Sequence, residues 1–226
     1  MKEEWCRLCM QDITAEQTFF DFLKQDAVLC GNCRRQLEVL NQKTNIRDMP
    51  LHIIYLYNDF LENMIFQYKE GLDTALKDVF FYDAMNKINI RFRHYTIVLM
   101  PSSEEKTRER GFIPVKEMLS RCKIPIIEPF YKISNHKQSL QTYENRELIS
   151  QVIKRNPNVR LPDTKLLLVD DVCTSGNTLS SAYHLLKGHS YKIEGLVLCA
   201  HQRFINSMKL KKWRNKSIFS GLEEYK

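Results

Sequence analysis

The feature that most restricts the fold is a pair of short apolar runs with a helical segment between them. The runs cover residues 165–169 and 193–199, and residues 178–187 place Leu and Ala side chains at helical spacing. Apolar runs of this length, bounded by polar residues, are typical of buried strands. A strand, a helix and a strand in this order form a βαβ unit with parallel neighbouring strands. We therefore expect an α/β domain, a parallel sheet flanked by helices.

Other elements are expected before this unit. Residues 95–100 form a third apolar run and predict a strand. Residues 72–85 have the apolar spacing of an amphipathic helix, and residues 143–154 predict a helix just before the βαβ unit. Residues 55–66 are apolar and aromatic, which fits either a strand leading into a helix or a docked helix.

The first strand of the βαβ unit ends in two acids and a polar loop. Asp170 and Asp171 follow the apolar run, and a loop rich in hydroxyl groups and glycine leads into the helix. Ligands of open α/β sheets lie outside the carboxyl ends of strands, and free N–H groups at a helix start favour phosphate. Acids would repel an anion but can accept hydrogen bonds from sugar hydroxyls, so a ribose phosphate fits both parts. The alternative is a capped turn without a ligand. The residues expected around the phosphate are Thr174, Ser175, Gly176, Asn177 and Thr178.

Four of the seven cysteines form two pairs near the start of the chain. Each pair has two residues between its cysteines, and twenty residues separate the pairs. This spacing predicts a closed structural zinc site, because four thiolates complete the tetrahedral shell and leave no position for a reactive water. Unrelated redox or buried cysteines are the alternative. The expected ligands are Cys6, Cys9, Cys30 and Cys33, whereas Cys122, Cys173 and Cys199 are expected to be single structural thiols.

The chain has 226 residues, enough for one medium domain and a small one. A polar stretch at residues 41–45, closed by Pro50, predicts a boundary between a four-cysteine module at 1–45 and an α/β domain at 46–226. No apolar run approaches the roughly 20 residues of a membrane helix. The first residues also lack the features of a secretory signal, so a cytoplasmic protein without a transmembrane segment is expected.

The last 26 residues are strongly basic. Residues 201–226 hold seven Lys or Arg and two Glu, and so contribute +5 to the net charge of +7. Cations around an aromatic ring can bind single-stranded DNA by charge and base stacking. A solvated or partly docked helix is the alternative. The candidate nucleic-acid residues are Lys211, Lys212, Trp213 and Arg214.

The acidic strand end resembles the signature of type I phosphoribosyltransferases, in which Asp-Asp and Val precede a Thr-Thr-Gly-x-Thr loop. With the four-cysteine module, the chain resembles the ComF family. Further resemblances are Phe66-Gln67-Tyr68-Lys69 with Gly71, Val98-Leu99-Met100-Pro101-Ser102-Ser103, Arg108-Glu109-Arg110-Gly111-Phe112, and Gln138 with Leu140 and Arg146. The resemblance implies that Asp170 and Asp171 bind the ribose hydroxyls of phosphoribosyl pyrophosphate, that residues 174–178 hold its 5′-phosphate, and that the ligand itself largely holds the Mg²⁺.

The same resemblance suggests where pyrophosphate would bind. Guanidinium groups pair bidentately with phosphate oxygens, which suits the two arginines of the Arg-Gly-Phe segment. Residues 104–110 alternate in charge, however, so a solvated loop is an equal alternative. The candidates are Ser102, Ser103, Arg108, Arg110 and Lys69.

The resemblance leaves two functions open. One is an accessory role in natural transformation, helping single-stranded DNA across the cytoplasmic membrane together with a ComFA-like helicase ATPase, in the cytoplasm and at the inner face of the membrane through partners. The other is an active phosphoribosyltransferase in nucleotide salvage or synthesis. Ile113 and Pro114 depart from the family's Arg-Gly-Phe-Asn-Gln, so no residue is assigned as catalytic. A plain DNA-binding zinc protein is a third alternative.

Overall fold

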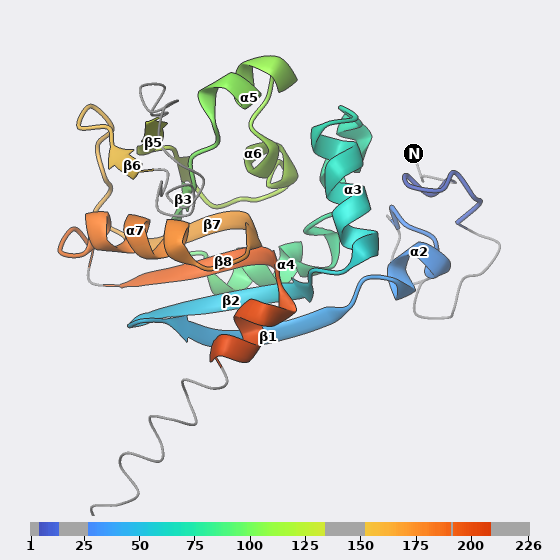
Figure 1. Cartoon of the computed structure of the whole chain (residues 1–226), viewed down its shortest axis with the longest axis horizontal. Coiled ribbons are helices and arrows are strands. Elements are labelled where there is room, and N and C mark those ends of the chain that lie inside the picture. Colours follow the sequence, from blue (N-terminus) through green and yellow to red (C-terminus); the bar gives the residue numbers. More distant parts are fainter. Residues whose placement is uncertain (1–4, 14–26, 134–151, 191, 209–226) are drawn as a thin grey trace, which may run out of the picture.

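The computed structural model describes residues 5–13, 27–133, 152–190 and 192–208 (Figure 1). Among these residues a six-stranded sheet has the order β1-β2-β8-β7-β3-β4. Only the pair β1 and β2 is antiparallel, and the four other neighbouring pairs are parallel. The predicted α/β class with a parallel sheet is therefore confirmed. The strands are β1 (Val39–Ile46), β2 (Met49–Leu56), β3 (Tyr95–Leu99), β4 (Ile126–Ile127), β7 (Lys165–Cys173) and β8 (Ile193–Ala200).

The predicted βαβ unit forms the centre of the sheet. Strands β7 and β8 are parallel neighbours, with α7 (Asn177–Leu186) between them in sequence. All eight residues of β8 are buried, as are Leu166 to Val169 of β7. A strand covered on both faces needs apolar side chains at successive positions, which explains why these two runs do not alternate with polar residues.

Helices cover both faces of the sheet (Figure 1). Leu167 and Val169 of β7 contribute to the cluster on one face, and Leu166 and Leu168 contribute to the cluster on the other. The first face carries α3 (Asp59–Lys69), the 3-10 helix η2 (Thr74–Asp78), α4 (Tyr82–Arg91) and α6 (Pro114–Met118). The second face carries α7, the helical residues 202–208, and an antiparallel hairpin of β5 (Phe130–Ile133) and β6 (Val152–Arg155).

Residues 55–66 form a strand end followed by a helix, the first of the two expected arrangements. Helix α3 begins after Asn58, whose side-chain oxygen accepts a hydrogen bond from the Leu61 N–H at 3.0 Å. Such a cap satisfies an N–H group that has no partner within the helix. The helix runs to Lys69, and Glu70 follows as its C-cap. This length brings Lys69 and Glu70 to the carboxyl edge of the sheet.

The single helix expected over residues 72–85 is wrong. The chain forms the short helix η2, then a turn, and begins α4 only at Tyr82. Asp73 favours this break, because its side chain accepts from the Ala75 N–H at 3.2 Å and starts η2. Phe80 and Phe81 lie in the turn and are almost fully buried. Leu76 and Val79, whose spacing suggested one continuous helix, are buried as well but lie in η2 and in the turn.

Two further segments differ from expectation. The helix predicted for residues 143–154 is wrong over 152–154, where β6 pairs with β5, and its remaining residues lie outside the described ranges. The polar stretch at 41–45 belongs to β1, an edge strand of the sheet. The division of the chain at residue 45 stays a prediction. Among the described residues, no helix has both the length and the apolarity needed to cross a membrane.

The four-cysteine module packs against the first face. It contains α2 (Gly31–Arg35), and its buried cysteines belong to the same apolar cluster as α3 and α4. Arg7 joins the module to η2, because its guanidinium donates to the Ala75 carbonyl at 3.0 Å and forms an ion pair with Asp78.

Candidate functional site

The candidate site lies where the central parallel strands end. Asp170 and Asp171 occupy the last part of β7, and the neighbouring strand β3 ends beside them. The Met100 N–H donates to the Val169 carbonyl at 3.0 Å, which fixes the loop after β3 next to the acids. The two sequence segments chosen for ribose phosphate and for pyrophosphate are therefore neighbours in space.

The loop after β7 has the form of an anion-binding helix start. Gly176 has φ +75° and is the N-cap of α7, and its carbonyl accepts from the Ser180 N–H at 2.9 Å. Thr174, Ser175 and Asn177 are exposed. The first N–H groups of a helix lack partners within it. Here they lie among exposed hydroxyl groups, and the Asn177 N–H makes a long hydrogen bond to Ser175 Oγ at 3.4 Å. This arrangement suits the oxygens of a phosphate ester.

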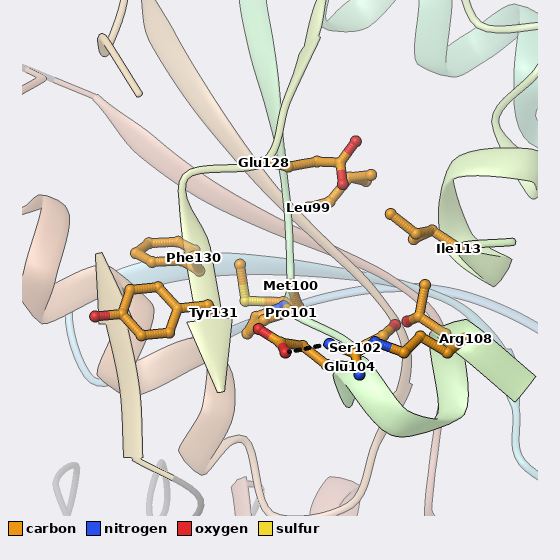
Figure 2. A pocket seen from close by; sticks show the side chains of 11 residues that line it. Leu99, Met100, Pro101, Ser102, Glu104, Arg108, Ile113, Glu128, Phe130 and Tyr131 are labelled. Atoms are coloured by element: carbon orange, nitrogen blue, oxygen red, sulfur yellow. Dashed lines mark ion pairs between the residues drawn. The ribbon is translucent and has the colours of Figure 1, made fainter. Parts of the chain in front are cut away.

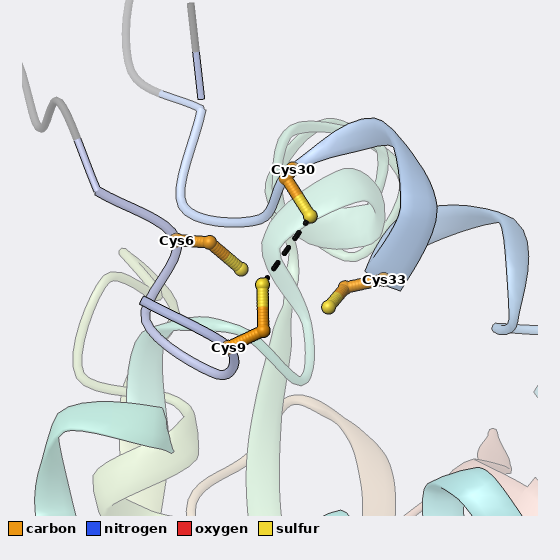
Figure 3. A group of neighbouring side chains, drawn as sticks. All are labelled: Cys6, Cys9, Cys30 and Cys33. Atoms are coloured by element: carbon orange, nitrogen blue, oxygen red, sulfur yellow. Dashed lines mark hydrogen bonds between the residues drawn. The ribbon is translucent and has the colours of Figure 1, made fainter. Parts of the chain in front are cut away.

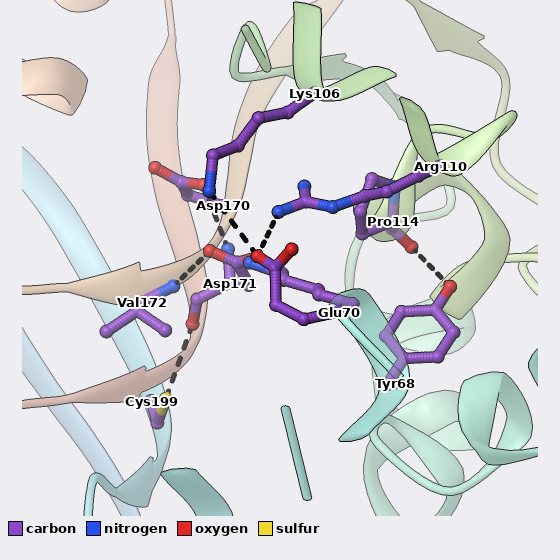
Figure 4. Close-up of polar contacts among 10 residues, drawn as sticks. Tyr68, Glu70, Lys106, Arg110, Pro114, Asp170, Asp171, Val172 and Cys199 are labelled. Carbon is purple, nitrogen blue, oxygen red and sulfur yellow. Dashed lines mark hydrogen bonds and ion pairs between the residues drawn. The ribbon is translucent and has the colours of Figure 1, made fainter. Parts of the chain in front are cut away.

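The two acids are held by the backbone and differ in their surroundings. Asp170 accepts from the Asp171 N–H at 3.0 Å, and Asp171 accepts from the Val172 N–H at 2.7 Å. Asp171 also forms an ion pair with Lys69 from α3 (Figure 4 shows the acids). Burial, and after it the negative charge of Asp171, raises the pKa of Asp170 to about 7. The Asp171 N–H and Lys69 lower this pKa but do not outweigh the two raising effects. Near neutral pH this carboxyl group can accept or donate a hydrogen bond, which suits it to sugar hydroxyls.

A group of cations lies beside the acids. Arg110 at the end of α5 (Glu104–Arg110) approaches Glu70 at 2.5 Å, and Lys106 approaches the same oxygen at 3.4 Å. The Arg110 side chain is only 9% exposed. The structure thus brings together two of the predicted pyrophosphate ligands, Lys69 and Arg110, although both are paired with carboxylates.

The other pyrophosphate candidates line or flank a pocket of about 470 Å³ at the end of β3 (Figure 2). Ser102 and Arg108 line it, opposite Phe130 and Tyr131 from β5. Arg108 is 83% exposed and lies 3.6 Å from Glu104, one helical turn earlier. Ser103 immediately precedes α5, and its carbonyl accepts from both the N–H and the hydroxyl of Thr107.

The four paired cysteines converge on one point (Figure 3). All four sulfur atoms lie within 4.8 Å of one another, and those of Cys9 and Cys30 are 3.6 Å apart. Four sulfurs at about 2.3 Å from a tetrahedral zinc are about 3.8 Å from each other, so the cluster has the right size. Burial raises the pKa of the Cys6 thiol, but N–H groups of Cys9, Cys30 and Leu8 outweigh it and lower this pKa to about 7. The cluster can hold a metal ion, and its all-thiolate donor set fits zinc.

The three other cysteines lie apart from this cluster. Cys173 and Cys199 are buried, and Cys122 is partly buried. Burial, with the nearby Asp170, raises the pKa of Cys173 to about 12, so the thiol at the end of β7 is held in its neutral form.

Sequence reasoning missed several residues at this edge. In the sequence, only the charge of Glu70 and Lys106 marked them as candidates. Their place at the site depends on contacts between the end of α3 and α5, which are distant in the sequence. Tyr57 and His201 also meet here, with ring centroids 4.1 Å apart, at the ends of β2 and β8. The predicted nucleic-acid residues Lys211, Lys212, Trp213 and Arg214 lie outside the described residues, as do Gln138, Leu140 and Arg146.

Comparison with known proteins agrees with this geometry. The model of the phosphoribosyl transferase domain family matches residues 108–217. The competence protein ComFC of Bacillus subtilis (strain 168) is 26% identical over 227 aligned residues, covering 85% of this chain and 93% of the relative. ComFC of Streptococcus pneumoniae (strain ATCC BAA-255 / R6) is 23% identical over 206 residues, covering 80% and 93%.

Two solved structures were also matched. An adenine phosphoribosyltransferase is 15% identical, with a TM-score of 0.37, over 76% of this chain and 91% of that chain. The orotate phosphoribosyltransferase from Aeropyrum pernix is 13% identical, with a TM-score of 0.30, over 76% and 93%. The family match, the two ComFC relatives and the observed cysteine cluster together confirm the resemblance read from the sequence. The chain is therefore similar to the ComFC proteins over most of its length, and its four clustered cysteines precede a segment that matches the phosphoribosyl transferase domain.

Proposed function

We propose that this protein binds phosphoribosyl pyrophosphate, or a related ribose phosphate, and assists the uptake of single-stranded DNA during natural transformation. The observation that carries the proposal is the end of β7, where two acids precede an exposed hydroxyl-lined loop at the start of α7. The loop would hold the 5′-phosphate, and the acids would accept hydrogen bonds from the ribose hydroxyls. The site residues are Asp170, Asp171, Thr174, Ser175, Gly176, Asn177 and Thr178.

The cations beside the acids would receive the pyrophosphate group. Lys69 and Arg110 lie at the same edge of the sheet as the phosphate loop, and Ser102 and Arg108 line the adjoining pocket. A magnesium ion would bind mainly to the ligand's own oxygens and would neutralise part of its charge. Zinc would have a structural role in the four-cysteine module.

The role in DNA uptake is supported by the two relatives, which are named competence proteins and are covered over 93% of their length. Single-stranded DNA would contact the basic residues 201–226, whose Lys and Arg outnumber their Glu by five. A ComFA-like helicase ATPase is the proposed protein partner. The protein would then act on the cytoplasmic side of the membrane through that partner.

Calorimetric titration tests ligand binding directly. Phosphoribosyl pyrophosphate with Mg²⁺ should bind the wild-type chain, and Asp170→Ala should weaken binding at least about tenfold, the loss expected for hydrogen bonds to a charged group. Asp163→Ala is the matched control, because Asp163 is exposed and lies just before the other end of β7. No binding by the wild type, or equal binding by Asp170→Ala, would contradict the proposal.

The DNA role needs a separate test. The titration is repeated with single-stranded DNA present, and the proposal expects the chain to bind both ligands. In a competent host, deletion of the gene should strongly reduce transformation by external DNA. Undiminished DNA uptake in the deletion strain would remove the competence role while leaving ligand binding to be judged from the titration.

An active phosphoribosyltransferase is the second candidate. The pocket of about 470 Å³ beside the acids favours it, since Phe130 and Tyr131 line a space large enough for a planar acceptor. The chain is incubated with phosphoribosyl pyrophosphate, Mg²⁺ and each of a panel of nucleobases. Release of pyrophosphate that depends on one base supports catalysis, and no release with any base opposes it.

A further inference from the structure

We infer that Glu70 acts as an internal stand-in for the pyrophosphate group, occupying the cations of the site until the ligand displaces it. This inference rests on the proposed function, because it concerns the regulation of the same site. The proposed site gives Glu70 no role, because its loop and the two acids of β7 account only for the ribose phosphate.

The contacts of Glu70 join two distant parts of the chain (Figure 4). Its Oε1 lies 2.5 Å from Arg110 Nη2 and 3.4 Å from Lys106 Nζ. Lys106 and Arg110 are four residues apart on α5, so they point from the same face of that helix. Glu70 itself is the C-cap of α3 and immediately follows Lys69, which pairs with Asp171. Each of the three cations is therefore paired with a carboxylate of the protein.

The pairing with Glu70 leaves a hydrogen-bond donor of the Arg110 guanidinium without a partner among the described residues. Only Nη2 is engaged by Glu70, and Nε is buried without a hydrogen-bond partner among the described residues. A guanidinium presents a planar fork of donors that matches two oxygens of a phosphate. An unpaired buried N–H is costly, so the site favours an anion that can fill the fork bidentately. Pyrophosphate has such oxygens, whereas Glu70 supplies one.

The exposures indicate which partner can leave. The Glu70 side chain is 38% exposed, but that of Arg110 is only 9% exposed. The carboxylate can therefore move into water while the guanidinium stays in place. The hydrogen bond from Arg110 lowers the pKa of Glu70, so the carboxylate is charged at neutral pH and competes fully with an incoming anion. Weakly charged, monodentate anions would fail to displace it.

The test is a titration of the full chain with inorganic pyrophosphate. Glu70→Gln should raise the affinity for pyrophosphate about tenfold, equivalent to about 1.4 kcal/mol, because the amide competes poorly for the cations. Glu105→Gln is the matched control: it removes the same charge from an exposed position on α5, and its affinity should stay within about twofold of the wild type. Adding Arg110→Ala to Glu70→Gln should abolish the gain.

Ribose 5-phosphate is titrated in parallel, since it lacks the pyrophosphate and should bind wild type and Glu70→Gln equally. An unchanged or weaker affinity of Glu70→Gln for pyrophosphate overturns the inference, even if ribose 5-phosphate binds and the proposed function stands. An equal gain in Glu105→Gln also overturns it, since any lost negative charge would then suffice. A gain confined to Glu70→Gln, without any binding of ribose 5-phosphate, supports the stand-in role and contradicts the proposed ribose-phosphate site.

Discussion

Replacing Gly176 with alanine should destabilise the protein more than the same change at Gly111. Both glycines have φ +75°, a left-handed conformation that costs a residue with a Cβ about 1 kcal/mol or slightly more. They differ in the space around the new Cβ. At Gly176 it would lie 2.8 Å from Ile46 Cδ1 and 3.1 Å from Phe204 Cε2, whereas at Gly111 nothing lies within 4 Å.

The magnitude follows from this difference in packing. Ile46 and Phe204 are both buried, so their displacement disturbs the core, and overpacking of this kind costs about 1–3 kcal/mol. The contacts are with the ends of flexible side chains, which favours the lower part of that range. We expect a loss of about 2–3 kcal/mol for Gly176→Ala and about 1 kcal/mol for Gly111→Ala.

Urea denaturation of the two variants and the wild type measures these free energies of unfolding. Ile46 of β1 and Phe204 of the helical residues 202–208 lie close to Gly176, so the result also bears on the loop proposed to bind phosphate. Equal destabilisation by the two variants would refute the reasoning, since the close packing under Gly176 would then have no energetic effect.

Two further predictions concern the metal and pH. Cys33→Ser should remove most of the zinc measured by elemental analysis and lower the Tm, whereas a variant that keeps its zinc would contradict the site. Burial alone would raise the pKa of Glu194, but hydrogen bonds from Tyr95, His52 and Lys192 lower it to about 2. Because this folded pKa lies below the unfolded value of about 4.3, the stabilisation is complete above that pH and is lost as the pH falls toward 2. The wild type should therefore lose its stability advantage over Glu194→Gln across this window, and a constant advantage would contradict the assignment.

Local patterns predicted the centre of the fold. Strands β7 and β8 and helix α7 follow from apolar runs and helical spacing, because a doubly covered strand is predominantly apolar. The candidate site could also be proposed from the sequence, since its acids, hydroxyl groups and glycine lie close together in one segment. The clustering of the four cysteines could be predicted from their spacing alone.

Contacts between distant segments were not predictable. Strand β1 alternates between exposed and partly buried residues, and as an edge strand it carries the polar side chains that suggested a domain boundary. Strand β6 forms because it pairs with β5, and the local pattern of apolar residues does not show this pairing. At the site, Glu70 and Arg110 are 40 residues apart, so the charge pattern of α5 alone could not show that its arginine is paired with α3.

A crystal structure with bound ribose 5-phosphate tests the central claim most directly. The account predicts that the phosphate accepts hydrogen bonds from the N–H and hydroxyl groups of residues 174–178, while Asp170 and Asp171 accept from the ribose hydroxyls. Electron density for the sugar phosphate at another surface, with the donors of that loop bonded internally, would contradict it.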